Sequence, residues 1–195
     1  MVDTNEVKTF FDSLADHWDD NMVINEKTMD LILSNAGIKS NVKVLDVACG
    51  TGVIIPYYFD RGAETVTAID ISSEMIKIAE GKFKSMNVEF ICDDAVKHTF
   101  DTQFDNIVVY NAFPHFGNPE GLISNLSSCL KNGGKLTIAH GMSRDRINAH
   151  HCNISKNLFV DLITIDELSD LVGRYLRVTI TVSDENMYQI VAEKC

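Results

Sequence analysis

Short β-rich runs alternate with longer segments of helical character along most of the chain. Five runs of mostly apolar and β-branched residues predict strands at residues 43–47, 65–69, 88–91, 106–110 and 135–139. The segments that predict helices lie at residues 53–60, 73–84, 119–130 and 165–175. Nearly continuous apolar strands that alternate with helices are typical of a parallel sheet covered on both faces.

Local signals mark where these helices begin and end. Ser72 or Ser73 is expected to cap the second helix. Asn118 precedes Pro119, a good first helical residue, and is expected to cap the third. The Asn-Gly-Gly sequence at residues 132–134 is expected to end that third helix, because glycine accepts a left-handed backbone.

The C-terminus departs from this alternation. Residues 177–183 (RVTITVS) and 187–193 (MYQIVAE) are strand-like and are joined by the turn Asp184-Glu185-Asn186. Two such runs around a short polar turn predict an antiparallel hairpin. A doubly wound sheet that ends in a hairpin differs from the ordinary dinucleotide-binding arrangement.

Composition narrows the class of protein. The net charge is −11 and no cluster of Lys and Arg occurs, which disfavours nucleic acid as a partner. No apolar run reaches the length of a membrane span, and residues 1–11 lack the pattern of a secretory signal. The five cysteines form no C-x-x-C pair, which disfavours a disulfide framework or a zinc ribbon. We therefore expect a cytoplasmic protein without a membrane span.

A glycine loop follows the first predicted strand, in VLDVACGTG at residues 44–52. Gly50 and Gly52 allow a ligand to approach the backbone closely. A dehydrogenase fingerprint requires a further glycine at position 55, which is Ile55 here. A glycine turn without a ligand is the alternative for this loop.

Acidic residues follow the next two strands. Asp70, in AIDIS, can accept both hydroxyls of a ribose, and is alternatively an acid near a helix N-terminus. Asp94 and Ala95, in ICDDA, can hold an adenine amino group, while a solvated turn is the alternative. Carboxyl ends of parallel strands share one edge of a sheet, so the loop and both acids are expected to meet there.

Taken in order, VLDVACGTG, AIDIS, CDDA, FDNIVVYNAF and LKNGGKLTI resemble the successive motifs of class I S-adenosylmethionine-dependent methyltransferases. The small-molecule enzymes of ubiquinone and menaquinone biosynthesis are the most similar branch, and the resemblance is strong over residues 40–140. It implies a Rossmann-like α/β three-layer sandwich. The sheet would have seven mostly parallel strands in the order 3-2-1-4-5-7-6, with the C-terminal pair antiparallel.

The resemblance also implies roles for single residues in binding S-adenosylmethionine. Asp46 would orient the glycine loop, Asp70 would bind the ribose and Asp94 the adenine amino group. The cofactor-binding set is Asp46, Ala48, Gly50, Gly52, Asp70, Ile71, Met75, Asp94, Ala95 and Asn111. Ala48 stands where many members have the first glycine of the loop. Met75 is alternatively a core residue, since methionine fills gaps well.

The methyl acceptor is expected beside the segments that follow the fourth and fifth strands. His115 is the candidate catalytic residue, because imidazole titrates near neutral pH, and a loop-fixing hydrogen bond is its alternative. Phe113, His140, Arg144 and His150 are the candidate substrate contacts. A salt bridge to Asp145 or Asp161 is the alternative for Arg144. The adjacent pair His150 and His151, with Cys152, has poor spacing for a metal, so no metal site is predicted.

The N-terminal residues 7–20 have apolar side chains at helical spacing, including Phe11 and Trp18. They predict a helix that closes over the cofactor or, alternatively, packs on the sheet. We expect one domain over residues 1–195. It would comprise a helical cap (1–36), a cofactor-binding core (40–140), acceptor-side helices (141–175) and the hairpin (176–195). The predicted function is methyl transfer to a small molecule; the alternatives are a non-catalytic cofactor-binding module and an NAD-binding oxidoreductase.

Overall fold

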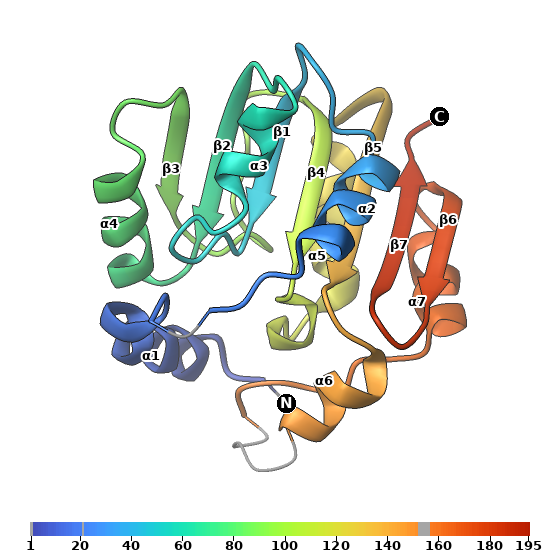
Figure 1. Cartoon of the computed structure of the whole chain (residues 1–195). Helices are drawn as coiled ribbons and strands as arrows, with labels where there is room; N and C mark the ends of the chain where they lie inside the picture. The colour runs from blue at the N-terminus through green and yellow to red at the C-terminus, as the bar shows by residue number, and fades with distance from the viewer. Residues whose placement is uncertain (1, 21, 152–156) are drawn as a thin grey trace.

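The computed structural model describes residues 2–20, 22–151 and 157–195. Within them, seven strands form one sheet in the order β3-β2-β1-β4-β5-β7-β6 (Figure 1). β1–β5 are parallel, whereas β7 is antiparallel to both β5 and β6. The predicted strand order and terminal hairpin are confirmed. The strands are β1 (Lys43–Val47), β2 (Thr65–Asp70), β3 (Val88–Cys92), β4 (Phe104–Tyr110), β5 (Leu130–His140), β6 (Arg177–Ser183) and β7 (Tyr188–Glu193).

Helices cover both faces of this sheet. α2 (Glu26–Ala36), α3 (Ile55–Asp60) and α4 (Ser73–Lys82) pack on one face, and α5 (Pro119–Ser128) and α7 (Ile165–Val172) pack on the other. Neighbouring residues of β1 show the division: Val44 is buried with Leu33 of α2, and Leu45 with Leu122 of α5. Successive strand side chains point to opposite faces, so a wholly apolar strand serves both layers.

Helix caps explain several boundaries. The Ser72 side chain accepts a hydrogen bond from the Met75 N–H and the Asn118 side chain one from Gly121, so both predicted caps are confirmed. The prediction that residues 132–134 end the third helix is wrong. α5 ends at Ser128, and residues 132–134 lie inside β5. The backbone of Gly133 donates to Lys194, whose own N–H donates to Gly134, so this glycine turn pairs with the C-terminal segment instead.

The N-terminal segment lies across the carboxyl edge of the parallel strands. α1 (Thr4–Leu14) continues into the 3-10 turn η1 (Ala15–His17), and α6 (Arg144–His151) lies on the same side of the molecule (Figure 1). α1 starts earlier than predicted because Asp3 caps it, accepting from the N–H groups of Asn5 and Glu6. α2, the second helix of residues 1–36, packs on the sheet rather than over its edge. None of the helices in the described parts of the chain is long and apolar enough to span a membrane.

Candidate active site

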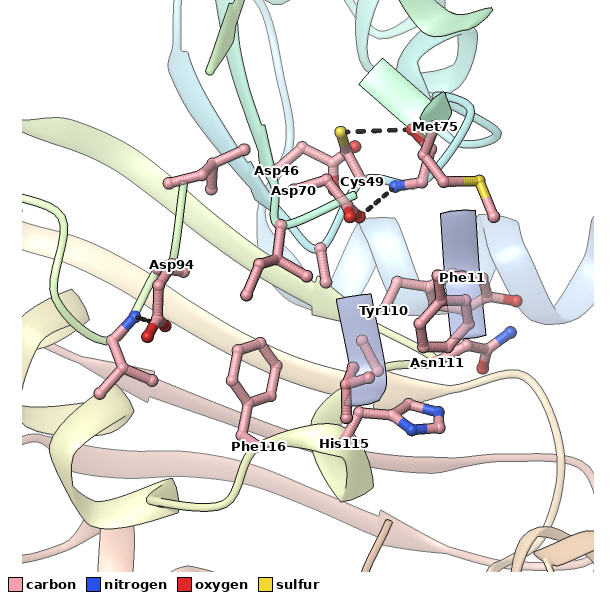
Figure 2. A pocket seen from close by; sticks show the side chains of 18 of the residues that line it. Phe11, Asp46, Cys49, Asp70, Met75, Asp94, Tyr110, Asn111, His115 and Phe116 are labelled. Carbon is pink, nitrogen blue, oxygen red and sulfur yellow. Dashed lines mark hydrogen bonds between the residues drawn. The ribbon is translucent and has the colours of Figure 1, made fainter. Parts of the chain in front are cut away.

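A cavity of about 410 Å³ lies between the carboxyl ends of the parallel strands and α1 (Figure 2). Open α/β sheets bind their ligands at this edge. Nine of the ten residues predicted to bind the cofactor line it: Asp46, Ala48, Gly50, Asp70, Ile71, Met75, Asp94, Ala95 and Asn111. The tenth, Gly52, lies behind the loop, where an added Cβ would be 2.5 Å from the Phe83 ring.

The glycine loop has three residues with left-handed backbone. Their φ angles are 55° at Ala48, 55° at Gly50 and 82° at Gly52. A Cβ added at Gly50 would have only the Trp18 Nε1 within 4 Å, at 3.8 Å, so the Gly50 backbone faces open space. Ala48 holds a conformation that costs an L-residue about 1–2 kcal/mol, which explains why a glycine suits this position.

Asp70 ends β2 and is tied to the glycine loop. Its Oδ2 accepts from the Gly50 N–H at 2.8 Å, and its Oδ1 accepts from the Ser72 N–H at 2.8 Å. Burial raises the pKa of the Asp70 carboxyl, and the backbone donors of Ser72, Gly50 and Ile71 oppose that rise. A carboxylate has about four acceptor positions, so these bonds leave room for further donors.

Asp46, near the end of β1, is the most buried acid of the site. Only 1% of its surface is exposed, and its Oδ1 accepts from the Tyr58 hydroxyl at 3.3 Å. Its Oδ2 has no hydrogen-bond partner among the described residues. Burial is the main cause that raises the pKa of Asp46, to about 8, and the charge of Asp70 adds to the rise. The site therefore holds a buried acid with one oxygen, Oδ2, that has neither a donor nor a cation as partner among the described residues.

The loop after β3 forms the far wall of the cavity. Asp94 Oδ1 accepts from the Val96 N–H at 3.0 Å, and Oδ2 pairs with the Lys97 ammonium at 3.0 Å. Met75 is only 1% exposed yet borders the cavity, so it is a core residue and a wall residue at once. Ile71, half-buried, also lines the cavity.

Asn111 follows β4 and fixes the next loop. Its φ is 54°, and its side-chain oxygen accepts from the Gly141 N–H at 3.0 Å, which joins the ends of β4 and β5. Tyr110 lines the cavity beside it. A Cβ at Gly141 would lie 2.4 Å from the Tyr110 hydroxyl, so only glycine fits there.

His115 lies in the 3-10 turn η2 (Phe113–His115) and borders the cavity. Its Nδ1 lies 2.8 Å from the backbone oxygen of Leu158. A carbonyl only accepts hydrogen bonds, so Nδ1 carries the proton and the neutral ring has its acceptor at Nε2. The Phe11 ring meets His115 edge to face (Figure 2).

Polar contacts fasten the N-terminal segment over the cavity. Asp12 of α1 accepts from the Ser72 hydroxyl at 2.6 Å and from the Glu74 N–H at 3.3 Å. Asp19 accepts from the Thr51 hydroxyl at 2.7 Å and pairs with Lys82 at 2.9 Å. The segment thus joins the start of α4 to the glycine loop.

The four residues predicted to contact the substrate do not line this cavity. Phe113, the first residue of η2, is buried in the core, and His140 is buried in β5, beside the Tyr188 ring. Arg144 donates through Nε to the Leu162 backbone oxygen and lies 3.6 Å from Asp145. His150 is exposed on α6. Cys152 lies outside the described residues, within which no group of three or more His, Cys, Asp and Glu side chains is arranged to hold a metal.

Some residues at or beside the cavity carry little or no signal of that position in the sequence patterns. Tyr110 reads as the last residue of a strand, and Tyr58 as one aromatic residue of an ordinary helix. Val7 belongs to the helix predicted to close over the cofactor, and Val2 lies before that predicted helix; both reach the cavity because the N-terminal segment folds back over it, where they pack on Leu158 and Phe159. Only the tertiary arrangement places these four side chains at or beside the site.

A family model described as a methyltransferase domain matches residues 44–134. The malonyl-[acyl-carrier protein] O-methyltransferase of Acetivibrio thermocellus is 30% identical over 142 residues, which cover 71% of this chain and 50% of that protein. The demethylmenaquinone methyltransferase of Renibacterium salmoninarum is 31% identical over 141 residues, which cover 69% and 58%. The chain therefore spans between half and two thirds of the length of these relatives.

Solved structures agree on the fold. The magnesium protoporphyrin IX methyltransferase of Synechocystis PCC 6803 with bound S-adenosylmethionine has a TM-score of 0.73 at 16% identity, with 100% of this chain and 98% of that chain covered. These comparisons confirm the family resemblance carried by the motifs. By its matched domain, its relatives and its fold, the chain belongs to the class I S-adenosylmethionine-dependent methyltransferases.

Proposed function

We propose that the chain is an enzyme that binds S-adenosylmethionine in this cavity and transfers its methyl group to a small-molecule acceptor. The observation that carries the proposal is the glycine loop flanked by two buried acids, Asp46 and Asp70, which both border the cavity. A cofactor with cationic groups and ribose hydroxyls supplies the charges and donors that such a site lacks.

The residues fit this cofactor. The open space at Gly50 admits close approach of a ligand to the backbone, and the unpartnered Oδ2 of Asp46 calls for a donor or a positive charge nearby. Asp70 would accept the ribose hydroxyls with the acceptor positions that its backbone bonds leave open. The adenine would lie along Ile71, Met75, Asp94 and Ala95, and Asn111 would border the methionine part.

The bound cofactor supplies a methyl group on a sulfonium sulfur, whose C–S bond breaks as the acceptor forms its new bond to carbon. This chain orients the acceptor and excludes water, and alignment of the two reactants accounts for much of the acceleration. His115 would take the acceptor's proton at Nε2, because the Leu158 oxygen holds the proton at Nδ1.

The acceptor would lie among His115, Phe11 and Phe116, which all line the cavity. Two of these side chains are apolar aromatics, which favours an apolar or aromatic acceptor such as those implied by a demethylmenaquinone-methylating relative. The four substrate contacts predicted from the sequence, Phe113, His140, Arg144 and His150, do not enter this proposal, since they do not border the cavity.

We further propose a single domain over residues 1–195 and a cytoplasmic location. Four cysteines lie in the described residues, Cys49, Cys92, Cys129 and Cys195, and all four are free thiols, as is usual in a reducing compartment. Limited proteolysis of the purified protein and cell fractionation test these two points.

Binding of S-adenosylmethionine and its demethylated product, S-adenosylhomocysteine, tests the proposal first. Calorimetry should give one site for each ligand and none for NADH. An acceptor screen that follows release of S-adenosylhomocysteine then tests catalysis. Binding without turnover on any quinol, phenol or thiol would favour a non-catalytic cofactor-binding module, and NADH binding alone would favour an oxidoreductase.

A further inference from the structure

Tyr58 is a fully buried tyrosine whose hydroxyl is committed to a single acid. It lies on α3 with 0% of its surface exposed, and it donates to Asp46 Oδ1 at 3.3 Å. A phenylalanine would fill the same space, so packing alone does not account for the hydroxyl. The bond fixes one oxygen of a carboxyl group whose other oxygen has no hydrogen-bond partner in the described residues.

Among the described residues, the titratable groups that act on this pair are a carboxyl, a thiol and a phenol, and none of them carries a positive charge. The charge of Asp70 in β2 contributes to the raised pKa of Asp46. Cys49 of the glycine loop and Tyr110 of β4 contribute to the raised pKa of Tyr58. Further away, the charge of Asp12 in α1 contributes to the raised pKa of Asp70, and the Asp12 carboxylate forms an ion pair with Lys8. The pair therefore lies in a field that favours a cationic ligand in the adjoining cavity.

We propose that Asp46 and Tyr58 make the site selective for the charge of its ligand. Asp46 loses its proton when the cationic sulfonium cofactor binds, and Tyr58 is the positioning residue that holds the resulting carboxylate. This inference rests on the proposed function, since it assumes that S-adenosylmethionine binds here. It assigns to the pair a preference for the sulfonium cofactor over the neutral thioether S-adenosylhomocysteine that the reaction leaves behind.

The chemistry follows from the environment. Burial raises the pKa of Asp46 to about 8, so near neutral pH the empty site holds the protonated acid. A nearby positive charge favours the ionised form, and the proton leaves Asp46 for the solvent. The thioether carries one positive charge fewer, so it drives this ionisation less. The Tyr58 hydroxyl stabilises the carboxylate, because a donated hydrogen bond favours the charged form of an acid.

The test compares the dissociation constants of S-adenosylmethionine and S-adenosylhomocysteine by calorimetry at pH 6, 7 and 8. In the unchanged protein, the preference for the sulfonium ligand should rise with pH over this range. Asp46→Asn should lower that preference about tenfold at pH 8. The rise of the preference with pH that comes from Asp46 should be absent in this variant. Tyr58→Phe should lower it severalfold in the same direction.

Two controls separate charge selectivity from damage to the fold. Tyr57→Phe removes the neighbouring hydroxyl, which donates to Glu26 on the surface, and should leave the preference unchanged. The ligands themselves ionise over this pH range, and this affects their binding to the unchanged protein and to Asp46→Asn equally. The difference between the two proteins at each pH therefore reports Asp46 alone. In the Asp46→Asn background, Tyr58→Phe should have no further effect on the preference.

Proton release gives a readout besides affinity. Binding enthalpies measured in buffers of different ionisation enthalpy should show more protons released per S-adenosylmethionine than per S-adenosylhomocysteine at pH 7, and no such difference in Asp46→Asn. An unchanged ligand preference in both variants, or an equal loss of affinity for both ligands, would overturn the inference. A protein that binds neither ligand would instead overturn the proposed function.

Discussion

The rings of Phe11 and His115 meet edge to face, with centroids 5.0 Å apart and planes at 89°. The contact joins α1 to η2 beside the cavity, so the N-terminal helix and the candidate catalytic histidine share one wall. Such aromatic pairs contribute roughly 0.5–1.5 kcal/mol beyond the burial of their surfaces. The contact thus links closure of the cavity to the orientation of the imidazole.

Replacing Phe11 by alanine should impair catalysis through this contact. We expect Phe11→Ala to raise the KM for the acceptor and to lower kcat by roughly tenfold, because a lost constraint of about 1.4 kcal/mol changes a rate tenfold. Steady-state kinetics with a fixed acceptor measures both. Phe10→Ala, one position away in the same helix, is the control. The link would be refuted if Phe11→Ala had the same kcat and KM as the unchanged protein.

His115→Ala should reduce turnover far more than cofactor affinity. Loss of a general base costs on the order of 10²–10⁴ in rate, whereas the affinity for S-adenosylhomocysteine should change by less than about threefold. His17→Ala, which removes a surface histidine paired with Asp20, should change neither. If turnover and affinity fall together in His115→Ala, the histidine only holds the loop through its bond to Leu158.

Asp70→Asn should weaken the binding of every ligand that contains the adenosine ribose. A hydrogen bond to a charged group contributes about 1.5–3 kcal/mol, so affinity should fall roughly 10- to 150-fold. Calorimetry with S-adenosylmethionine and adenosine measures the loss. Asp93→Asn, at an exposed neighbouring acid, should have a much smaller effect. Affinity that stays constant in Asp70→Asn would exclude the ribose assignment.

The raised pKa of Asp46 makes the ligand-free protein less stable as the pH increases. Between its unfolded pKa near 4 and its folded pKa of about 8, the folded acid keeps a proton that the unfolded acid has lost. Stability conferred below this window is therefore lost as the pH rises through it, by at most about 1.4 kcal/mol per pH unit. Denaturant unfolding at pH 5 to 8 should show a shallower decline in Asp46→Asn; a decline of the same slope would contradict the assignment.

Ala48→Gly should stabilise the protein. The left-handed backbone at Ala48 costs about 1–2 kcal/mol, and the flexibility of glycine costs about 0.5–1 kcal/mol, so the net gain is at most about 1.5 kcal/mol. We expect a rise in Tm of a few degrees in thermal unfolding. Ala79→Gly, inside α4, is the matched control and should lower Tm by a similar amount. A lower Tm in Ala48→Gly would show that its methyl group packs well enough to outweigh the strain.

The sequence patterns predict the central elements well, because apolar strands and capped helices depend on local chemistry. Ser72 and Asn118 are such cases, since each cap is decided within three residues. The motifs also identify Asp70 and Gly50, which the sheet brings into direct contact although they lie twenty residues apart. The motifs thus locate the part of the cavity that we propose for the cofactor.

The part of the cavity that we propose for the acceptor depends on packing between distant segments, which local patterns do not contain. His140 was expected in a loop, but β5 runs one residue further and pairs His140 with Tyr188 of β7, which buries the imidazole. Arg144 was expected at the acceptor, but α6 lies against residues near Leu162, whose backbone oxygen takes its Nε–H. The burial of Tyr58 against Asp46 likewise follows only from the fold of α3 onto the sheet.

The contacts of Asp12 and Asp19, which hold the N-terminal segment over the cavity, have a kinetic consequence. We expect a ligand bound beneath α1 to leave faster when the bonds of these two acids to Ser72, Glu74, Thr51 and Lys82 are weakened. The residence time of spent cofactor would therefore be governed by four side-chain and backbone contacts that touch no reacting atom. If product release limits the proposed reaction, its rate should then depend on salt and on the N-terminal segment, while the reacting groups stay the same.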